Sequence, residues 1–146
     1  MPIFSSTIKR PLGVQLTVVS PGDFKETLYF YQDNSTASQA AVALTCMGDA
    51  VRTGYALPVP SSVIGITIVS NAARTAGTLT VDATIAGSAT GLQAVLNGTN
   101  TTVHYANQDD DRDQVAAGEL IGVKVTTDAG WLPETADIIV AVTVGY

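Results

Sequence analysis

The chain has 146 residues, of which 46% are hydrophobic and 14% are charged, and its formal net charge at pH 7 is −6. This length fits one domain, and the apolar content excludes a chain that is disordered throughout. The seven Lys and Arg residues are scattered, which argues against nucleic acid as a direct partner because phosphate binding requires clustered basic side chains.

Residues 1–25 are predicted to form an extended N-terminal arm. Three prolines disfavour helix interiors and central strands there, because proline fixes φ and has no N–H donor; they are Pro2, Pro11 and Pro21. Within the arm, LTVVS at 16–20 is compatible with an edge strand, and a loose terminus is the other interpretation. No apolar run reaches the length of a membrane helix and no signal peptide is visible, so no membrane partner is expected.

The distribution of charge also distinguishes residues 1–25 from the rest of the chain. The arm carries a net charge of +2, from Lys9, Arg10 and Lys25 against Asp23, which leaves −8 for residues 26–146. A slightly basic arm therefore precedes an acidic body, and residues 26–146 are predicted to be the folded domain.

The first strand of that domain is predicted over ETLYFYQD at 26–33. Leu28 and Phe30 would face one side and Tyr29 and Tyr31 the other. Because both sides are apolar, this strand is expected to be covered on both faces.

A second strand is predicted over AAVALTC at 40–46. It ends at Cys46, the only cysteine, which excludes an intrachain disulfide and a multi-cysteine metal site. The apolar flanks favour an inert core thiol, and the alternative is a thiol at a subunit contact.

The most regular pattern follows at 62–85 and predicts a hairpin through the loop NAARTAG at 71–77. Apolar residues occupy every second position, the period of a half-buried strand, while threonines project outward. The expected inward residues are Ile64, Ile66 and Ile68 on one strand and Leu79, Val81, Ala83 and Ile85 on the other.

The remaining strands are predicted from the same alternation. AGSATG at 86–91 is a turn before a short strand at 92–96, and NGTN at 97–100 is a tight turn of the kind that Asn-Gly favours before a strand at 101–107. Two later strands are expected to point Ile121, Val123 and Val125, and then Ile138, Val140, Val142 and Val144, into the core. About eight strands and no helical periodicity predict an all-β antiparallel sandwich of the jelly-roll type.

Asp109, Asp111 and Asp113 have the alternating spacing that begins a calcium-binding loop. The rest of that motif fails, because Gln114 stands at the position of the turn glycine and Leu120 at that of the bidentate glutamate. A solvated acidic loop is the favoured interpretation, and contact with a divalent cation or a lysine-rich partner is the alternative.

Catalytic equipment is sparse. His104 is the only histidine, so a two-histidine metal site is impossible, and no Gly-x-Ser-x-Gly elbow or phosphate-binding loop occurs. His104 is therefore interpreted as a strand or rim residue. No enzymatic activity, cofactor or metal is expected.

Trp131 lies in the long connection DAGWLPETAD at 128–137. A sugar-stacking platform aided by Tyr105 or Tyr55 is one interpretation. A plug that closes the end of the sandwich is the favoured one.

Two stretches carry a resemblance to a known family, namely GITIVSNAARTAGTLTVDATIAG and VAAGELIGVKVTTDAGWLPETADIIVAVTV. They resemble the small jelly-roll virion proteins of tailed bacteriophages, in which a Gly-rich hairpin precedes an "aaGd-x-i-g-v" strand, a "W-x-P" turn and a "tAdi" last strand. The resemblance covers residues 62–146. Glu119 stands where Asp is commoner in this pattern.

The resemblance implies a capsid decoration (cement) protein, a homotrimer bound to the major capsid protein on the outer capsid surface of the virion. The basic arm is expected to lie across the acidic capsid surface, with contacts from Phe4, Ile8, Lys9, Arg10 and Leu12. The alternative is a receptor- or glycan-binding head of a phage fibre or tail protein that uses Trp131, Tyr105 and the acidic loop.

Overall fold

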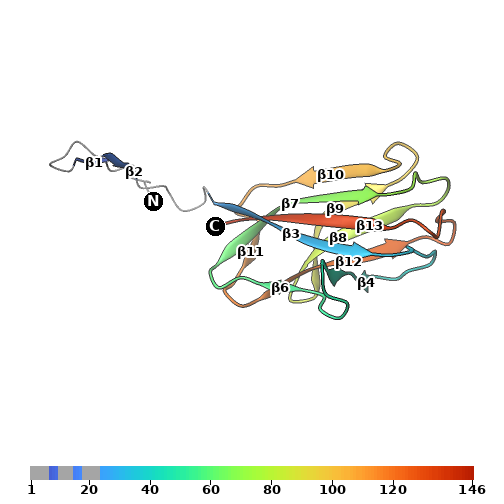
Figure 1. Ribbon diagram of the computed structural model, residues 1–146, viewed down its shortest axis with the longest axis horizontal. Coiled ribbons are helices and arrows are strands. Elements are labelled where there is room, and N and C mark those ends of the chain that lie inside the picture. Colours follow the sequence, from blue (N-terminus) through green and yellow to red (C-terminus); the bar gives the residue numbers. More distant parts are fainter. Residues whose placement is uncertain (1–6, 10–14, 18–23) are drawn as a thin grey trace.

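A computed structural model describes residues 7–9, 15–17 and 24–146, and Figure 1 shows two β-sheets packed face to face. The six-stranded sheet has the order β10 (Val103–Asn107), β7 (Ser61–Ser70), β13 (Ile138–Gly145), β3 (Lys25–Gln32) and β5 (Thr45–Cys46), and β11 (Asp113–Val115) also pairs with β7. The five-stranded sheet has the order β4 (Val42–Ala43), β12 (Leu120–Thr127), β8 (Leu79–Ile85) and β9 (Ser88–Leu96), and β6 (Tyr55–Ala56) also pairs with β12. Residues 24–146 thus form an antiparallel jelly-roll sandwich, as predicted.

The core lies between the two sheets and is built from alternate residues of each long strand. Ile138, Val140, Val142 and Val144 on β13 are all fully buried, and Ile121, Val123 and Val125 on β12 face them from the other sheet. Each such side chain contributes roughly 1.5–3 kcal/mol when it leaves water. These two strands have the predicted inward residues.

The predicted hairpin between residues 62 and 85 is wrong, because β7 and β8 belong to different sheets. The chain crosses from one sheet to the other between them. The hairpin is instead β8–β9, whose turn is made by Ala86 and Gly87 with φ of 49° and 80°. Two consecutive positive φ values are typical of the type I′ turn that suits the twist of a two-residue hairpin.

The turn predicted at Asn97-Gly98 also has a different role. It does not join a hairpin, since β9 and β10 lie in different sheets. The Asn97 side chain accepts hydrogen bonds from the backbone N–H groups of Thr99 and Asn100, at 2.9 and 3.0 Å. This local capping by an Asn side chain stabilises a crossing loop.

The single strand predicted at 40–46 is two short strands in different sheets. β4 pairs with β12, and β5 pairs with β3. Leu44, which lies between them, is buried with 1% of its surface exposed. The alternation of apolar residues continues through the crossing, which is why the sequence pattern does not reveal it.

Two irregularities occur next to β7 and β8, and one of them changes a predicted inward residue. The register of β7 against β13 shifts beside Ile64, so that Val63 is fully buried and Ile64 is half-buried. A second shift, between β8 and β9, places the extra residues on β9, so β8 stays in regular register with β12 and the half-buried Ile85 packs against the core as predicted. Only the bulge at Ile64 inserts an unpaired residue into β7 and inverts the alternation beyond it.

On β3, Leu28 and Phe30 point into the core, but Tyr29 is 48% exposed and Tyr31 is half-buried. The expectation that this strand is covered on both faces therefore fails within residues 24–146. A two-layer sandwich covers only the inner face of each sheet.

The arm is described only in part. β1 (Thr7–Lys9) and β2 (Gln15–Thr17) pair antiparallel as a separate two-stranded sheet. Ile8 and Lys9 belong to β1, whereas Phe4, Arg10 and Leu12 lie outside the described residues. Within the described ranges, no helix is long and apolar enough to cross a membrane.

Candidate assembly surface

The outer face of the six-stranded sheet is uncharged across its centre. Strand registers place its outward side chains in two rows, one with Val103, Val69, Ile139 and Tyr31 and one with Tyr105, Thr67, Ala141 and Tyr29. These eight residues are named the tyrosine face. Lys25, a basic residue on this side, lies at the margin, at the first position of β3.

The tyrosine face is accessible in the isolated chain. Tyr105 is 65% exposed, and Tyr29, Val69, Val103 and Ile139 are each between 45% and 49% exposed. Large exposed apolar patches of this kind mark surfaces that bind other macromolecules. Tyrosine is enriched at such contacts because it buries a large ring and keeps a polar hydroxyl.

The outer face of the five-stranded sheet differs in charge. Asp82 and Lys124 are register partners in the middle of that sheet. The Gln93 side chain donates a hydrogen bond of 2.6 Å to the Asp82 carboxylate, and Lys124 donates one of 2.6 Å to the carbonyl of Gly87. Burial of these groups against a partner would require their desolvation. The two outer faces are therefore suited to different environments, the charged one to water and the tyrosine face to a contact.

The acidic loop lies at the end of the sandwich, between β10 and β11. Asp109 and Asp111 are exposed, whereas the half-buried Asp113 carboxylate accepts a hydrogen bond from the Gln108 side chain. The same Gln108 amide donates to the carbonyl of Val63 at 2.8 Å. Among the residues that the structure describes, no three His, Cys, Asp or Glu side chains are grouped in a way that could hold a metal ion.

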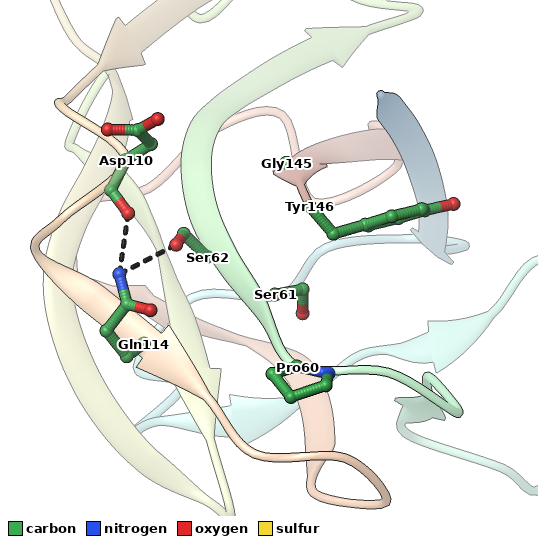
Figure 2. Close-up of a pocket in the computed structure, with 7 residues that line it drawn as sticks. All are labelled: Pro60, Ser61, Ser62, Asp110, Gln114, Gly145 and Tyr146. Carbon is green, nitrogen blue, oxygen red and sulfur yellow. Dashed lines mark hydrogen bonds between the residues drawn. The ribbon is translucent and has the colours of Figure 1, made fainter. Parts of the chain in front are cut away.

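A surface hollow of ≈ 240 Å³ lies beside this loop, where β7 begins and the chain ends (Figure 2). The Gln114 amide bridges two of its walls, donating to the Ser62 hydroxyl at 2.8 Å and to the carbonyl of Asp110 at 2.6 Å. The Tyr146 hydroxyl donates to the Glu26 carboxylate at 3.1 Å, and this bond raises the pKa of Tyr146. The acidic loop is thus held by amide hydrogen bonds to the sandwich.

Trp131 is fully buried, and its indole forms no hydrogen bond with the acidic loop. Its indole N–H donates to the backbone carbonyl of Ser35 at 2.9 Å and to the Ser35 hydroxyl at 3.2 Å. The ring closes one end of the sandwich and has no face open to a ligand in this structure. Tyr105, its suggested companion, instead lies on the tyrosine face.

His104, Cys46 and Tyr55 have structural contacts. His104 Nδ1 accepts a hydrogen bond of 2.9 Å from the backbone N–H of Val95, and the Tyr55 hydroxyl donates one of 3.0 Å to the carbonyl of Tyr29. Burial raises the pKa of the Cys46 thiol and that of Tyr55. A thiol held protonated in this way is a poor nucleophile.

The tyrosine face is not among the sites predicted from the sequence, although the sequence contains a signal for it. Alternate positions in four separate strands combine tyrosine, valine, isoleucine and threonine without a charge, while the equivalent positions of β8 and β12 include Asp82 and Lys124. Only the strand order shows that the four uncharged sets are neighbours.

Comparison with known proteins places the fold. No known protein family and no curated protein sequence matches this chain. A chain in the acidic stable capsid structure of Helicobacter pylori bacteriophage KHP30 is similar, with 10% identity over 86% of this chain and 90% of that one and a TM-score of 0.52. At this identity the likeness concerns the fold alone.

Two weaker likenesses have TM-scores too low to support an argument. A chain in the capsid asymmetric unit of cyanophage Pam1 is 21% identical over 86% of both chains, with a TM-score of 0.41. The globular domain of the zebrafish complement 1qA protein is 12% identical over 84% of this chain and 96% of that one, with a TM-score of 0.43.

Proposed function

We propose that this protein is a structural component of a bacteriophage particle, a decoration (cement) protein that binds the major capsid protein on the outer surface of the head as a homotrimer. The observation that carries the proposal is the tyrosine face, an exposed and uncharged sheet surface on an otherwise acidic jelly roll. The fold shared with a chain in a phage capsid structure supports the same role. The proposal includes no chemical reaction.

The charge distribution favours self-association through the tyrosine face. Residues 26–146 carry a net charge of −8, so two copies repel each other in most orientations. The tyrosine face brings no acidic group into the contact. Burial of its valine, isoleucine and tyrosine side chains supplies the favourable free energy.

The N-terminal arm is proposed as the part that contacts the capsid, through Phe4, Ile8, Lys9, Arg10 and Leu12. It carries a net charge of +2, opposite in sign to the body. Opposite charges in the two parts allow the arm to bind an acidic capsid surface while the body faces solvent.

The alternative is a receptor- or glycan-binding head of a phage fibre. The burial of Trp131 removes the strongest candidate for sugar stacking. Tyr105 and the acidic loop remain available to such a ligand. Of the three ligand-binding features expected from the sequence, this alternative therefore retains two, Tyr105 and the acidic loop.

The test combines co-sedimentation of the purified protein with heads that lack it and light scattering of the free protein. A trimer that saturates the heads at a fixed ratio is expected. A variant without residues 1–12 is expected to keep its oligomeric mass and lose head binding. Head binding at full occupancy by that variant would refute the role of the arm.

Two other outcomes would count against the proposal as a whole. A monomer in solution that also fails to bind heads would exclude a trimeric decoration protein. Retention on host cells or on a glycan surface, without head binding, would instead support the fibre-head alternative.

A further inference from the structure

Half of one strand edge has no partner among the described residues. All eight residues of β3 pair with β13 on one side, whereas β5 pairs only with Phe30 and Tyr31 on the other. The half of β3 from Lys25 to Leu28 therefore has an open edge. The next residue, Tyr29, is occupied, since its carbonyl accepts hydrogen bonds from Met47 and Tyr55.

The open edge presents backbone hydrogen-bonding groups to solvent. The carbonyls of Tyr29 and Tyr31 both point away from β13, towards Met47 and Thr45. Because the direction of these groups alternates along a strand, the N–H and C=O groups of Lys25 and Thr27 point to the same open side. An edge of this kind is a template for another strand.

A groove runs beside this edge. It has a volume of ≈ 470 Å³, and Tyr29, Met47, Tyr55 and Leu57 contribute its apolar walls. Glu26 adds an acidic group. Unpaired backbone groups next to an apolar groove are the two features by which a sheet edge binds an extended segment.

The chain contains a strand that needs such a partner. β1 and β2 pair over only three residues each, and isolated two-stranded hairpins are at best marginally stable in water. Within the described residues β2 pairs only with β1, so its second edge is open as well. A third strand would stabilise this hairpin.

The connection between β2 and β3 has the length and residues of a reversing loop. Thr17 ends β2 and Lys25 begins β3, and Pro21-Gly22 lies between them. Pro followed by Gly is favoured in tight turns. A short connection also gives the two edges a high effective concentration for each other, on the order of millimolar. The net charge of +2 on residues 1–25 is opposite in sign to Glu26 in the groove.

We propose that β2 pairs antiparallel with the Lys25–Leu28 half of β3 in the same chain, so that the β1–β2 hairpin extends the six-stranded sheet. This pairing satisfies both open edges and covers the groove. It gives the arm a fixed starting point on the body, whatever the arm then binds.

Disulfide trapping tests the pairing in the full chain. In a Cys46→Ala background, Thr27→Cys is combined in turn with Gln15→Cys, Leu16→Cys and Thr17→Cys, which together sample the register. Directly opposed residues of an antiparallel pair have Cα atoms about 4.5–5.5 Å apart, within the range of a disulfide. At least one combination is expected to form an intrachain disulfide under mild oxidation, visible as a faster-migrating monomer. In the matched control, Gln93→Cys on the other sheet replaces Thr27→Cys and is combined with the same three arm cysteines. This control is expected to form no intrachain disulfide.

Interchain disulfides alone would overturn the proposal in favour of exchange between copies, and equal trapping by the Gln93 control would overturn it in favour of a mobile arm. Hydrogen exchange gives a second readout without cysteines. The Thr27 amide is expected to exchange at least about tenfold faster in Leu16→Pro than in Ser5→Pro, because only the former removes a β2 residue from pairing. Equal exchange in both variants would also overturn the proposal.

Discussion

His104 on β10 accepts a hydrogen bond through Nδ1 from the backbone N–H of Val95 on β9, with 2.9 Å between the nitrogens. β10 and β9 are the last strands of the two different sheets. The bond therefore joins the sheets along one side of the sandwich. The only histidine of the chain thus supplies the hydrogen-bond acceptor for a backbone N–H group on the edge strand β9.

His104→Ala is expected to lower the free energy of unfolding by about 1–2 kcal/mol, because the part-buried Val95 N–H loses its acceptor. His104→Asn is the matched variant, since its side-chain oxygen can take the place of Nδ1, and it is expected to recover part of the loss. Urea unfolding of the three proteins measures this. Equal stability of the Ala and Asn variants would show that the hydrogen bond contributes nothing.

Trp131 provides a spectroscopic test of the plug. Because the indole is fully buried and is the only tryptophan, its fluorescence is expected to resist quenching by iodide and to be unchanged by added glycans. Trp131→Phe keeps most of the ring volume and removes the hydrogen bonds to Ser35, at a cost of about 1–3 kcal/mol. Ser35→Ala, which removes only the hydroxyl partner, is expected to cost less. A glycan-dependent change in emission would contradict the burial of the ring.

The tyrosine face predicts where a charge disrupts assembly. Ile139→Lys places an ammonium in the middle strand of this face, between Val69 and Tyr31, and is expected to convert the oligomer to a folded monomer. Gln93→Lys places the same group on the charged outer face and is expected to leave the mass unchanged. Light scattering gives the mass and circular dichroism checks the fold. Loss of the oligomer in both variants, or in neither, would exclude the tyrosine face as the specific contact.

Alkaline pH is expected to destabilise the fold through Cys46. Burial raises the pKa of this thiol above its ordinary 9.0, so the folded state favours the protonated form. The resulting stability is complete below pH 9 and is lost as the pH rises through the higher pKa of the folded state. Tyr55, whose pKa is also raised by burial, acts in the same direction from about pH 10. Urea unfolding between pH 7 and pH 10 is expected to show a smaller decline in Cys46→Ala, and an identical decline would contradict this account.

The sequence predicts strands well where each strand stays in one sheet. On β12 and β13 the alternation of Ile and Val is unbroken, and every predicted inward residue is buried. On β7 and β8 the same pattern leads to a wrong hairpin, since alternation identifies a strand and its two faces but not its neighbour. The local bulges at Ile64 on β7 and at residues 90–92 on β9 are equally invisible to it.

The candidate surface depends on pairing over long sequence separations. Tyr29, Thr67, Tyr105 and Ala141 form one row because β3, β7, β10 and β13 are neighbours in the sheet. The sequence does predict that Tyr29 and Tyr31 lie on the face of β3 opposite to Leu28 and Phe30. Residues 24–146 supply no cover for the tyrosine face, so the cover expected there has to come from outside this part of the chain.

Comparison of Gly77→Ala with Gly87→Ala distinguishes the cost of backbone strain from the cost of a clash near Trp131. Gly77 and Gly87 both have positive φ, of 71° and 80°. A Cβ at Gly77 would clash with the backbone nitrogen of Trp131, whereas a Cβ at Gly87 meets nothing within 4 Å. Gly87→Ala is therefore expected to cost only the left-handed backbone strain, about 1–2 kcal/mol. Gly77→Ala adds a clash with the loop that holds the plug, so its cost is expected to exceed that of Gly87→Ala severalfold and to expose Trp131 to iodide. Thermal unfolding and quenching of the two variants measure the difference, and equal effects would mean that the loop yields without displacing the indole.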